Sequence, residues 1–484
     1  MSGSAPAAPD LNAVFRGGGR SIEFLDRINK ASLVMLEETG IVPRPLAARI
    51  AAGIAQLIEQ ERTGGIPPRS GADYLDYEPR LTAIVGADAS RLHSGRSRQD
   101  IAAAIARMNL RDGLLRTFEA LAIAREKLVT VAGRHVETIV PAYTHGVQAQ
   151  PTTFAHYLHA LAAALGRESE RLRHAYQRVN RSPLGAAVLA TSSFALDRER
   201  LAALLGFEGL IENAYDANHL APVDSALDAA GALAIAAVQI GQFAQDIHAQ
   251  YAEPAPWLML AAGELTGVSS IMPQKRNPAA LEQLRAQASL MLGEMQTVFL
   301  LAHNNRTGTF DYRMYDPVPC GRPLQVFKLL QQVIEGIVVD PQRALAEVDA
   351  DYSTTTEIAD ALLQKADVPF RVGHHFASRL ADYGRGKKLE LREIPYAEVA
   401  RLYEEDTAQA FPLGEADFRK IISAEYMVFG RKGRGGPQPA EMNRMLAEER
   451  DGIGADFAWL EERSGRLAQA DAVLERAFAA LAEK

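Results

Sequence analysis

Apolar residues recur at helical spacing along most of the chain. After Asp100 the apolar residues on one helical face are Ile101, Ile105, Met108, Leu115, Phe118 and Ala122. The strongest turn signal in this stretch is Asp112-Gly113. A second series alternates steps of four and three residues, as a bundle seam does: Leu233, Ala237, Ile240, Ala244 and Ile247. Since no convincing stretch alternates Val, Ile and Thr with polar residues, we predict an all-α fold with a long central helical bundle.

Small residues surround the second apolar series. Alanine and glycine occupy several sides of the segment from Ala229 to Ile240, so neighbouring helices can pack on more than one face. We therefore expect this helix at the centre of the bundle. The same stretch is too short to cross a bilayer, and the sequence predicts no membrane segment.

Changes in helix length and turn signals predict three domains. Residues 1–100 hold shorter helices broken by glycine and proline, and residues 101–350 hold the long helices. Residues 351–484 return to shorter amphipathic helices, with a glycine-rich break at 430–437. A chain of 484 residues is long enough for such a division.

Composition and charge exclude several classes of protein. The net charge of −8 is mild and argues against a nucleic-acid-binding surface. Cys320 is the single cysteine, which excludes an intrachain disulfide and fits a reducing, cytoplasmic compartment. No HExxH or CxxC spacing and no nucleotide-binding glycine pattern occurs, so we expect neither a metal nor a cofactor.

Three polar segments interrupt the apolar helices and are candidates for a site. We call residues 93–100 the arginine segment, residues 141–151 the histidine segment and residues 267–278 the serine loop. The arginine segment precedes a long helix, whose free N–H groups favour anions, and its two arginines can each hold a carboxylate. A capped, solvated loop is the alternative for this segment alone.

The histidine segment places Thr144 and His145 in a turn closed by Pro151. A histidine can give or take a proton near neutral pH. A lone histidine is more often structural, so the segment alone does not decide between the two roles.

The serine loop contains two serines, a lysine and an asparagine between a glycine and a proline. A serine acts as a base only when it is held close to an alkoxide, here by Lys275 and by backbone N–H groups. Lys275 and Asn277 would also stabilise the aci-carboxylate that forms when the neighbouring carbon loses its proton. Ser269 and Ser270 are both candidates for the base.

The three segments together resemble the argininosuccinate lyase branch of the fumarase/aspartase superfamily. The similar motifs are His93-Ser-Gly-Arg-Ser-Arg98, Tyr143-Thr-His145 with Ala149-Gln-Pro151, and Ser269-Ser-Ile-Met-Pro-Gln-Lys-Arg-Asn-Pro278. Ile358-Ala-Asp-Ala-Leu362 and Val368-Pro-Phe-Arg371 resemble the C-terminal domain of that family. The similar segments occur in the same order as in that family, from about residue 20 to near the end of the chain.

The resemblance implies a three-domain helical homotetramer whose active sites are shared between subunits. It implies elimination of an amine from an N-substituted aspartate to give fumarate, without a cofactor. Ser269 would be the base, chosen over Ser270 for its six-residue offset from Lys275, and His145 would assist the leaving nitrogen. The substrate-binding residues would be Ser97, Arg98, Gln99, Thr144, Asn277 and Tyr312.

Departures from the family pattern lie around the leaving amine. Gln99 stands where asparagine is usual, Val268 replaces a glycine and Ala279 replaces an aspartate. The segments 216–222 and 311–320 lose charged or polar residues of the family, although Tyr312 survives. We therefore predict an amine other than arginine, such as an aminopolycarboxylate of the ethylenediamine-disuccinate type.

Other readings stay open. Arg16 and Arg20 in the N-terminal arm would suit an amine with extra carboxylates, or the arm is a plain flexible terminus. A genuine argininosuccinate lyase is the first alternative. An inactive structural homologue, or another enzyme of the superfamily such as an adenylosuccinate lyase or a carboxymuconate cycloisomerase, is more remote.

Overall fold

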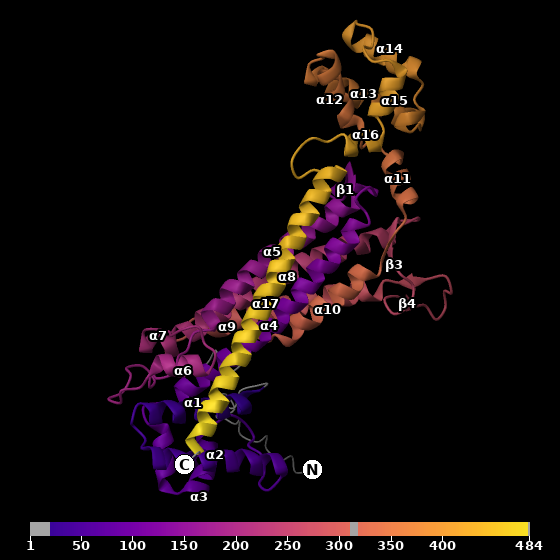
Figure 1. Ribbon diagram of the computed structural model, residues 1–484. Coiled ribbons are helices and arrows are strands. Elements are labelled where there is room, and N and C mark those ends of the chain that lie inside the picture. The colour runs from indigo at the N-terminus through magenta and orange to yellow at the C-terminus, as the bar shows by residue number, and fades with distance from the viewer. Residues whose placement is uncertain (1–19, 310–317, 483–484) are drawn as a thin grey trace.

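A computed structural model describes residues 20–309 and 318–482. The molecule is elongated, with a long bundle between two smaller groups of helices (Figure 1). Helices hold 69% of the residues and strands 5%. The predicted all-α fold is therefore confirmed.

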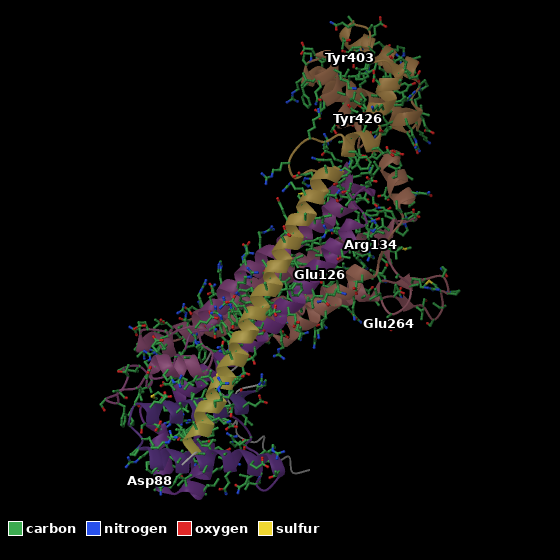
Figure 2. All side chains as sticks on the ribbon, in the orientation of Figure 1. Asp88, Glu126, Arg134, Glu264, Tyr403 and Tyr426 are labelled. Carbon is green, nitrogen blue, oxygen red and sulfur yellow. The ribbon has the colours of Figure 1, made fainter. Side chains whose placement is uncertain are left out.

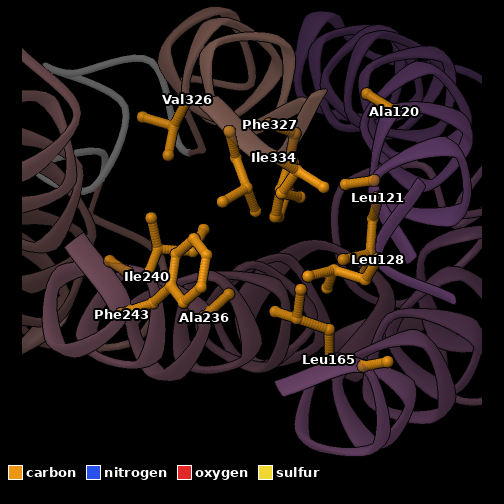
Figure 3. Packing of buried hydrophobic residues seen from close by; sticks show 14 of the residues in the cluster. Ala120, Leu121, Leu128, Leu165, Ala236, Ile240, Phe243, Val326, Phe327 and Ile334 are labelled. Carbon is orange, nitrogen blue, oxygen red and sulfur yellow. The ribbon is translucent and has the colours of Figure 1, made fainter. Parts of the chain in front are cut away.

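Long helices that pack side by side form the bundle. They are α4 (Arg98–Gly133), α5 (Phe154–Val179), α8 (Ala221–Ala249), α9 (Ala279–Ala302) and α10 (Gly321–Glu335). The apolar series on α8 is buried in one cluster, to which α4, α5, α8 and α10 all contribute and which includes Leu115 and Phe118 of α4 (Figure 3). Ile101, Ile105 and Met108, in the first turns of α4, lie in a second cluster. Alanines on α8 leave room for both α5 and α9, so α8 packs on more than one face, as predicted.

The N-terminal group has its own apolar cluster. Its helices are α1 (Ser21–Glu38), α2 (Arg44–Thr63), α3 (Tyr74–Val85) and the 3₁₀ helix η2 (Ala87–His93). The first turns of α4 contribute to this cluster, as does the short helix α6 (Arg198–Leu204). The helix α7 (Ala214–His219) lies next to the start of α8.

The C-terminal group packs around a third apolar cluster between Tyr352 and Ile422. Its elements are α12 (Thr355–Ala366), α13 (Phe370–Lys387), η5 (Leu391–Glu393), α14 (Tyr396–Thr407) and α15 (Glu415–Ile421). Buried residues of α11 (Pro341–Ala350) and α16 (Ala424–Phe429) form a separate small cluster with Ile139. The last helix, α17 (Pro439–Ala482), runs back along the bundle against α4 and reaches α1 and α2 (Figure 1). The division at residues 100 and 350 stays a prediction.

Strands are short and occur as antiparallel pairs in the described part of the chain. They are β1 (Ile139–Thr144) with β2 (Val147–Thr153), β3 (Leu258–Leu260) with β6 (Ile337–Val339), and β4 (Gly267–Val268) with β5 (Arg276–Asn277). The 3₁₀ helix η3 (Gln250–Ala252) continues α8. Strands of two to seven residues are too short for an alternating pattern to reveal.

The apolar helix at the bundle centre is longer than the sequence suggested. Residues Ala221–Ala252 form one helix that is long and apolar enough to span a membrane by length and composition alone. The prediction that this stretch is too short was therefore wrong on length, because the helix continues on both sides of it. Half of its most apolar window is buried inside one copy of the chain.

Candidate active site

The arginine segment ends at the first turn of α4. Ser97 is the N-cap, and its Oγ accepts a hydrogen bond from the backbone N–H of Gln99 at 3.1 Å. Arg98 donates two hydrogen bonds to the Asp73 carboxylate, from Nε at 3.0 Å and from Nη2 at 2.7 Å. Asp73 in turn caps α3 by accepting from the N–H of Leu75. Sequence reasoning missed Asp73, although an N-cap aspartate before Tyr74 is a recognisable helix start.

Two further polar side chains fix the same segment to the chain around residue 218. Gln99 donates from Nε2 to the carbonyl oxygen of Asn218 at 3.3 Å. Asp100 is fully buried and accepts from Asn218 and from the N–H groups of Ala187 and Val188. Burial raises the pKa of Asp100, and these hydrogen bonds oppose that shift. Asp100 therefore holds the segment in place rather than facing solvent.

The histidine segment is the hairpin of β1 and β2. Thr144 and His145 lie exposed at its tip, and His145 has a φ of 55°, in the left-handed region. Next to them, the Tyr143 hydroxyl donates to Glu347. Burial, together with this hydrogen bond, raises the pKa of Tyr143 to about 12. The tip thus exposes a threonine and a histidine to solvent.

The serine loop is closed at its base by the pairing of β4 with β5. Ser269 is half-buried, and its Oγ accepts from the N–H groups of Met272 at 3.0 Å and Ile271 at 3.4 Å. The backbone N–H groups that reach the serine therefore come from the loop itself and not from a helix start, since α9 begins only at Ala279. Lys275 is exposed and Asn277 is half-buried.

The three polar segments do not meet within one copy of the chain. The arginine segment precedes α4 and the histidine segment follows it, and 36 helical residues extend for about 54 Å. Figure 2 shows this span between Asp88, just before the arginine segment, and Arg134, at the end of α4. The serine loop projects sideways with β4 (Figure 1). Across residues 20–309 and 318–482, no hydrogen bond or ion pair joins any two of the three segments.

Two of the predicted binding residues lie outside the described residues. These are Tyr312 and Arg16. Arg20 is described, and it donates to Glu23 at 2.6 Å and to Asp112 at 3.2 Å. The hydrogen bond to Glu23 raises the pKa of Arg20 above its ordinary value. In one copy of the chain this arginine is therefore engaged by two carboxylates.

Comparisons with known proteins match the chain along most of its length. The family model described as lyase matches residues 28–293, and the one described as argininosuccinate lyase C-terminal matches residues 352–428. Argininosuccinate lyase 2 of Agrobacterium fabrum (strain C58 / ATCC 33970) is 32% identical, over 97% of this chain and 95% of the relative.

The chain belongs to the argininosuccinate lyase-like branch of the fumarase/aspartase superfamily.

Solved structures of similar shape agree with this assignment. EDDS lyase in complex with formate has a TM-score of 0.87 and 29% identity, covering 96% of this chain and 92% of that chain. A variant of EDDS lyase with bound fumarate has a TM-score of 0.86, with the same identity and coverage. The fold is thus that of the fumarase/aspartase superfamily, and this lyase-family member is a carbon–nitrogen lyase.

Proposed function

We propose that this protein eliminates an amine from an N-substituted L-aspartate and releases fumarate, with Ser269 as the base. The observation that carries the proposal is the loop geometry. Ser269 Oγ accepts two backbone hydrogen bonds in a loop that also holds Lys275 and Asn277. Hydrogen bonds donated to an oxygen favour its charged form, which is the form a serine base needs. Ser270 has no such side-chain hydrogen bond among the described residues.

The reaction follows from these groups. The Ser269 alkoxide takes the Cβ proton of the aspartate skeleton, and the electron pair of that C–H bond moves into the neighbouring carboxylate as an aci-carboxylate. Lys275 and Asn277 stabilise the two negative charges that develop there. The pair then forms the C=C bond of fumarate while the C–N bond breaks and its electrons leave with nitrogen. His145 would help to protonate that nitrogen.

Other predicted residues would bind the succinyl part of the substrate. The planar Arg98 guanidinium is already oriented by Asp73, and a fixed guanidinium suits a carboxylate. Ser97, Gln99 and Thr144 are uncharged hydrogen-bonding groups suited to the same substrate. No cofactor is part of this scheme.

We propose further that several copies of the chain share each site in a homotetramer. The separation of the segments along α4 supports this, because one copy leaves Arg98 and Thr144 at opposite ends of a helix of about 54 Å. Exposed apolar side chains on α8 and α9 provide a surface for neighbouring copies. These are Ile235, Val238, Leu290, Phe299 and Leu300.

The leaving amine that we propose is an aminopolycarboxylate of the ethylenediamine-disuccinate type. The likeness to EDDS lyase supports it, as do Gln99, Val268 and Ala279, which replace the usual family residues. Argininosuccinate is the alternative substrate, favoured by curated relatives that carry the name argininosuccinate lyase. The single cysteine supports a cytoplasmic location for the enzyme.

Fumarate absorbance tests the proposal directly. Purified protein is mixed in turn with ethylenediamine-disuccinate and with argininosuccinate, and fumarate is followed over time. We expect release from both or from the first alone, with a higher kcat/KM for ethylenediamine-disuccinate. Release from argininosuccinate alone would establish the alternative substrate, and no release from any N-substituted aspartate would refute the lyase assignment to this site.

A further inference from the structure

A pocket of about 320 Å³ opens where α8 begins and α9 ends. It lies next to the arginine segment, because Gln99 donates to the carbonyl of Asn218 and the following residue, His219, lines the pocket. The pocket is therefore within reach of whatever the arginine segment binds. It contains two basic side chains, His219 and Arg306, that the scheme above does not use.

His219 is held in one orientation and one tautomer. Its Nδ1 lies 3.0 Å from the carbonyl oxygen of Tyr215, so this nitrogen carries the proton and donates it. The imidazole also stacks on the Tyr215 ring, with centroids 4.3 Å apart. Since Nδ1 is engaged, Nε2 is the nitrogen left to meet a ligand, as an acceptor when neutral and as a donor when protonated.

The loop after α9 closes tightly over this imidazole. Gly308 has a φ of 86°, and a Cβ at this position would lie 2.8 Å from His219 Nε2. The Tyr215 hydroxyl and Thr307 Oγ1, 3.1 Å apart, fix the same loop to α7. A side chain at residue 308 would therefore displace the ring.

Arg306 provides the positive charge of the pocket. Its guanidinium forms no hydrogen bond or ion pair with any residue in the described ranges, whereas Arg98 and Arg20 are both paired. The lining also includes the apolar residues Val223, Leu227 and Ala302. A pocket that combines a cation with apolar side chains suits a short alkyl chain that ends in a carboxylate.

Asp224 adds a negative group to the same pocket. A carboxylate can accept hydrogen bonds from a protonated amine, while Arg306 holds a carboxylate of the same molecule. The pocket thus combines the charges that a carboxylate-bearing amine requires, at a volume sufficient for a few carbon atoms.

We propose that this pocket is the subsite for the leaving amine and selects amines that carry a carboxylate. Arg306 binds that carboxylate with help from His219 Nε2, and Asp224 receives the amine. The inference rests on the proposed function, since it assigns a second part of the same substrate. It makes His219 and Arg306 specificity-determining residues of the chain.

Binding of a matched pair of ligands tests the subsite. One ligand is ethylenediamine-disuccinate, whose leaving amine bears carboxylates, and the other is N-propyl-aspartate, whose leaving amine, propylamine, bears none. Calorimetry in a Ser269→Ala background keeps both ligands intact. We expect Arg306→Gln to raise the Kd of ethylenediamine-disuccinate by roughly 10- to 100-fold, as loss of a charge-assisted hydrogen bond should. The Kd of N-propyl-aspartate, whose leaving amine has no carboxylate for Arg306 to bind, should change by less than about threefold.

Controls separate this role from a general loss of structure. Arg306 is exposed, so its replacement leaves the core intact, and Arg167→Gln on α5 is a matched change of an exposed arginine outside the pocket. Arg167→Gln should leave both dissociation constants unchanged. His219→Gln should likewise weaken the binding of ethylenediamine-disuccinate more than that of the control ligand. An equal effect of Arg306→Gln on both ligands, or no effect on either, would overturn the subsite.

Argininosuccinate forms a third arm of the experiment. A selective loss of its binding in Arg306→Gln would support the subsite and identify the carboxylate-bearing amine as arginine. The subsite and the lyase reaction can fail independently. Fumarate release that does not depend on Arg306 would overturn the subsite alone. Binding that depends on Arg306, without any fumarate release, would support the subsite and contradict the lyase reaction.

Discussion

Ser269 and Ser270 are neighbours with different environments. The Ser269 oxygen accepts two backbone hydrogen bonds and is half-buried, while Ser270 is exposed. We therefore expect Ser269→Ala to lower kcat by about 10² to 10⁴-fold, the range of a lost general base. Ser270→Ala is the control of identical chemistry, and it should cost far less. Fumarate absorbance measures both, and a larger loss in Ser270→Ala would move the base to that residue.

His93 makes the stability of the protein depend on pH. Burial, together with the charge of Arg96, lowers the pKa of His93 from 6.5 to about 4. Between these values the unfolded chain takes up a proton that the folded chain excludes. Stability is therefore fully present above pH 6.5 and falls as the pH drops toward 4.

A phenylalanine at this position isolates the contribution of His93. His93→Phe keeps a ring on Tyr74, where the two centroids are 4.3 Å apart, but it has no proton to bind. We expect the Tm of this variant to fall less than that of the parent between pH 7 and pH 5. Thermal melts at both pH values measure this, and an identical fall in both proteins would assign the dependence to other groups.

Among the elements, α17 is attached to the bundle by a buried charge cluster. Arg125 on α4 binds Glu449 and Asp456 on α17, and also Ser169 on α5. Arg125 and Asp456 are each about 4% exposed. Removing one partner of a buried ion pair leaves the other charge without its partner in an apolar environment, although Arg173 still binds Asp456.

Arg125→Ala should therefore destabilise the protein by about 3 kcal/mol, at the lower end of the range for breaking a buried pair. Arg116→Ala is the control on the same helix, because Arg116 is exposed and bonds to the Asp112 carbonyl within its own helix. Chemical denaturation should show little change for the control. If both variants unfold at the same denaturant concentration, the cluster does not hold α17.

Some helices and strands can be predicted from the sequence and others cannot, for physical reasons. The long helices follow from apolar spacing, and Ser97 at the start of α4 is a recognisable cap. The strands at the serine loop are two residues each, so their pairing comes from the closure of the loop and leaves no pattern. The path of α17 is also hidden, because an amphipathic helix shows which face is buried but not against which partner.

At the scale of the whole molecule, chemistry and assembly are linked. The residue types of the candidate site are readable from three motifs, but their separation in space is a property of the fold. Arg98 begins α4 and Thr144 lies beyond its other end, while the serine loop projects with β4 to one side of the bundle (Figure 1). A single copy therefore holds all the parts without assembling them, and we propose that several copies share each site.

Complementation between two inactive variants tests that claim most directly. Arg98→Ala and Ser269→Ala are expressed together, so that the proposed tetramers contain both variants, and fumarate release is measured against each variant alone. If each site takes these residues from different copies, about a quarter of the sites in random hybrids contain both intact residues. We predict recovery toward that level. Hybrid tetramers as inactive as either parent would contradict a shared site.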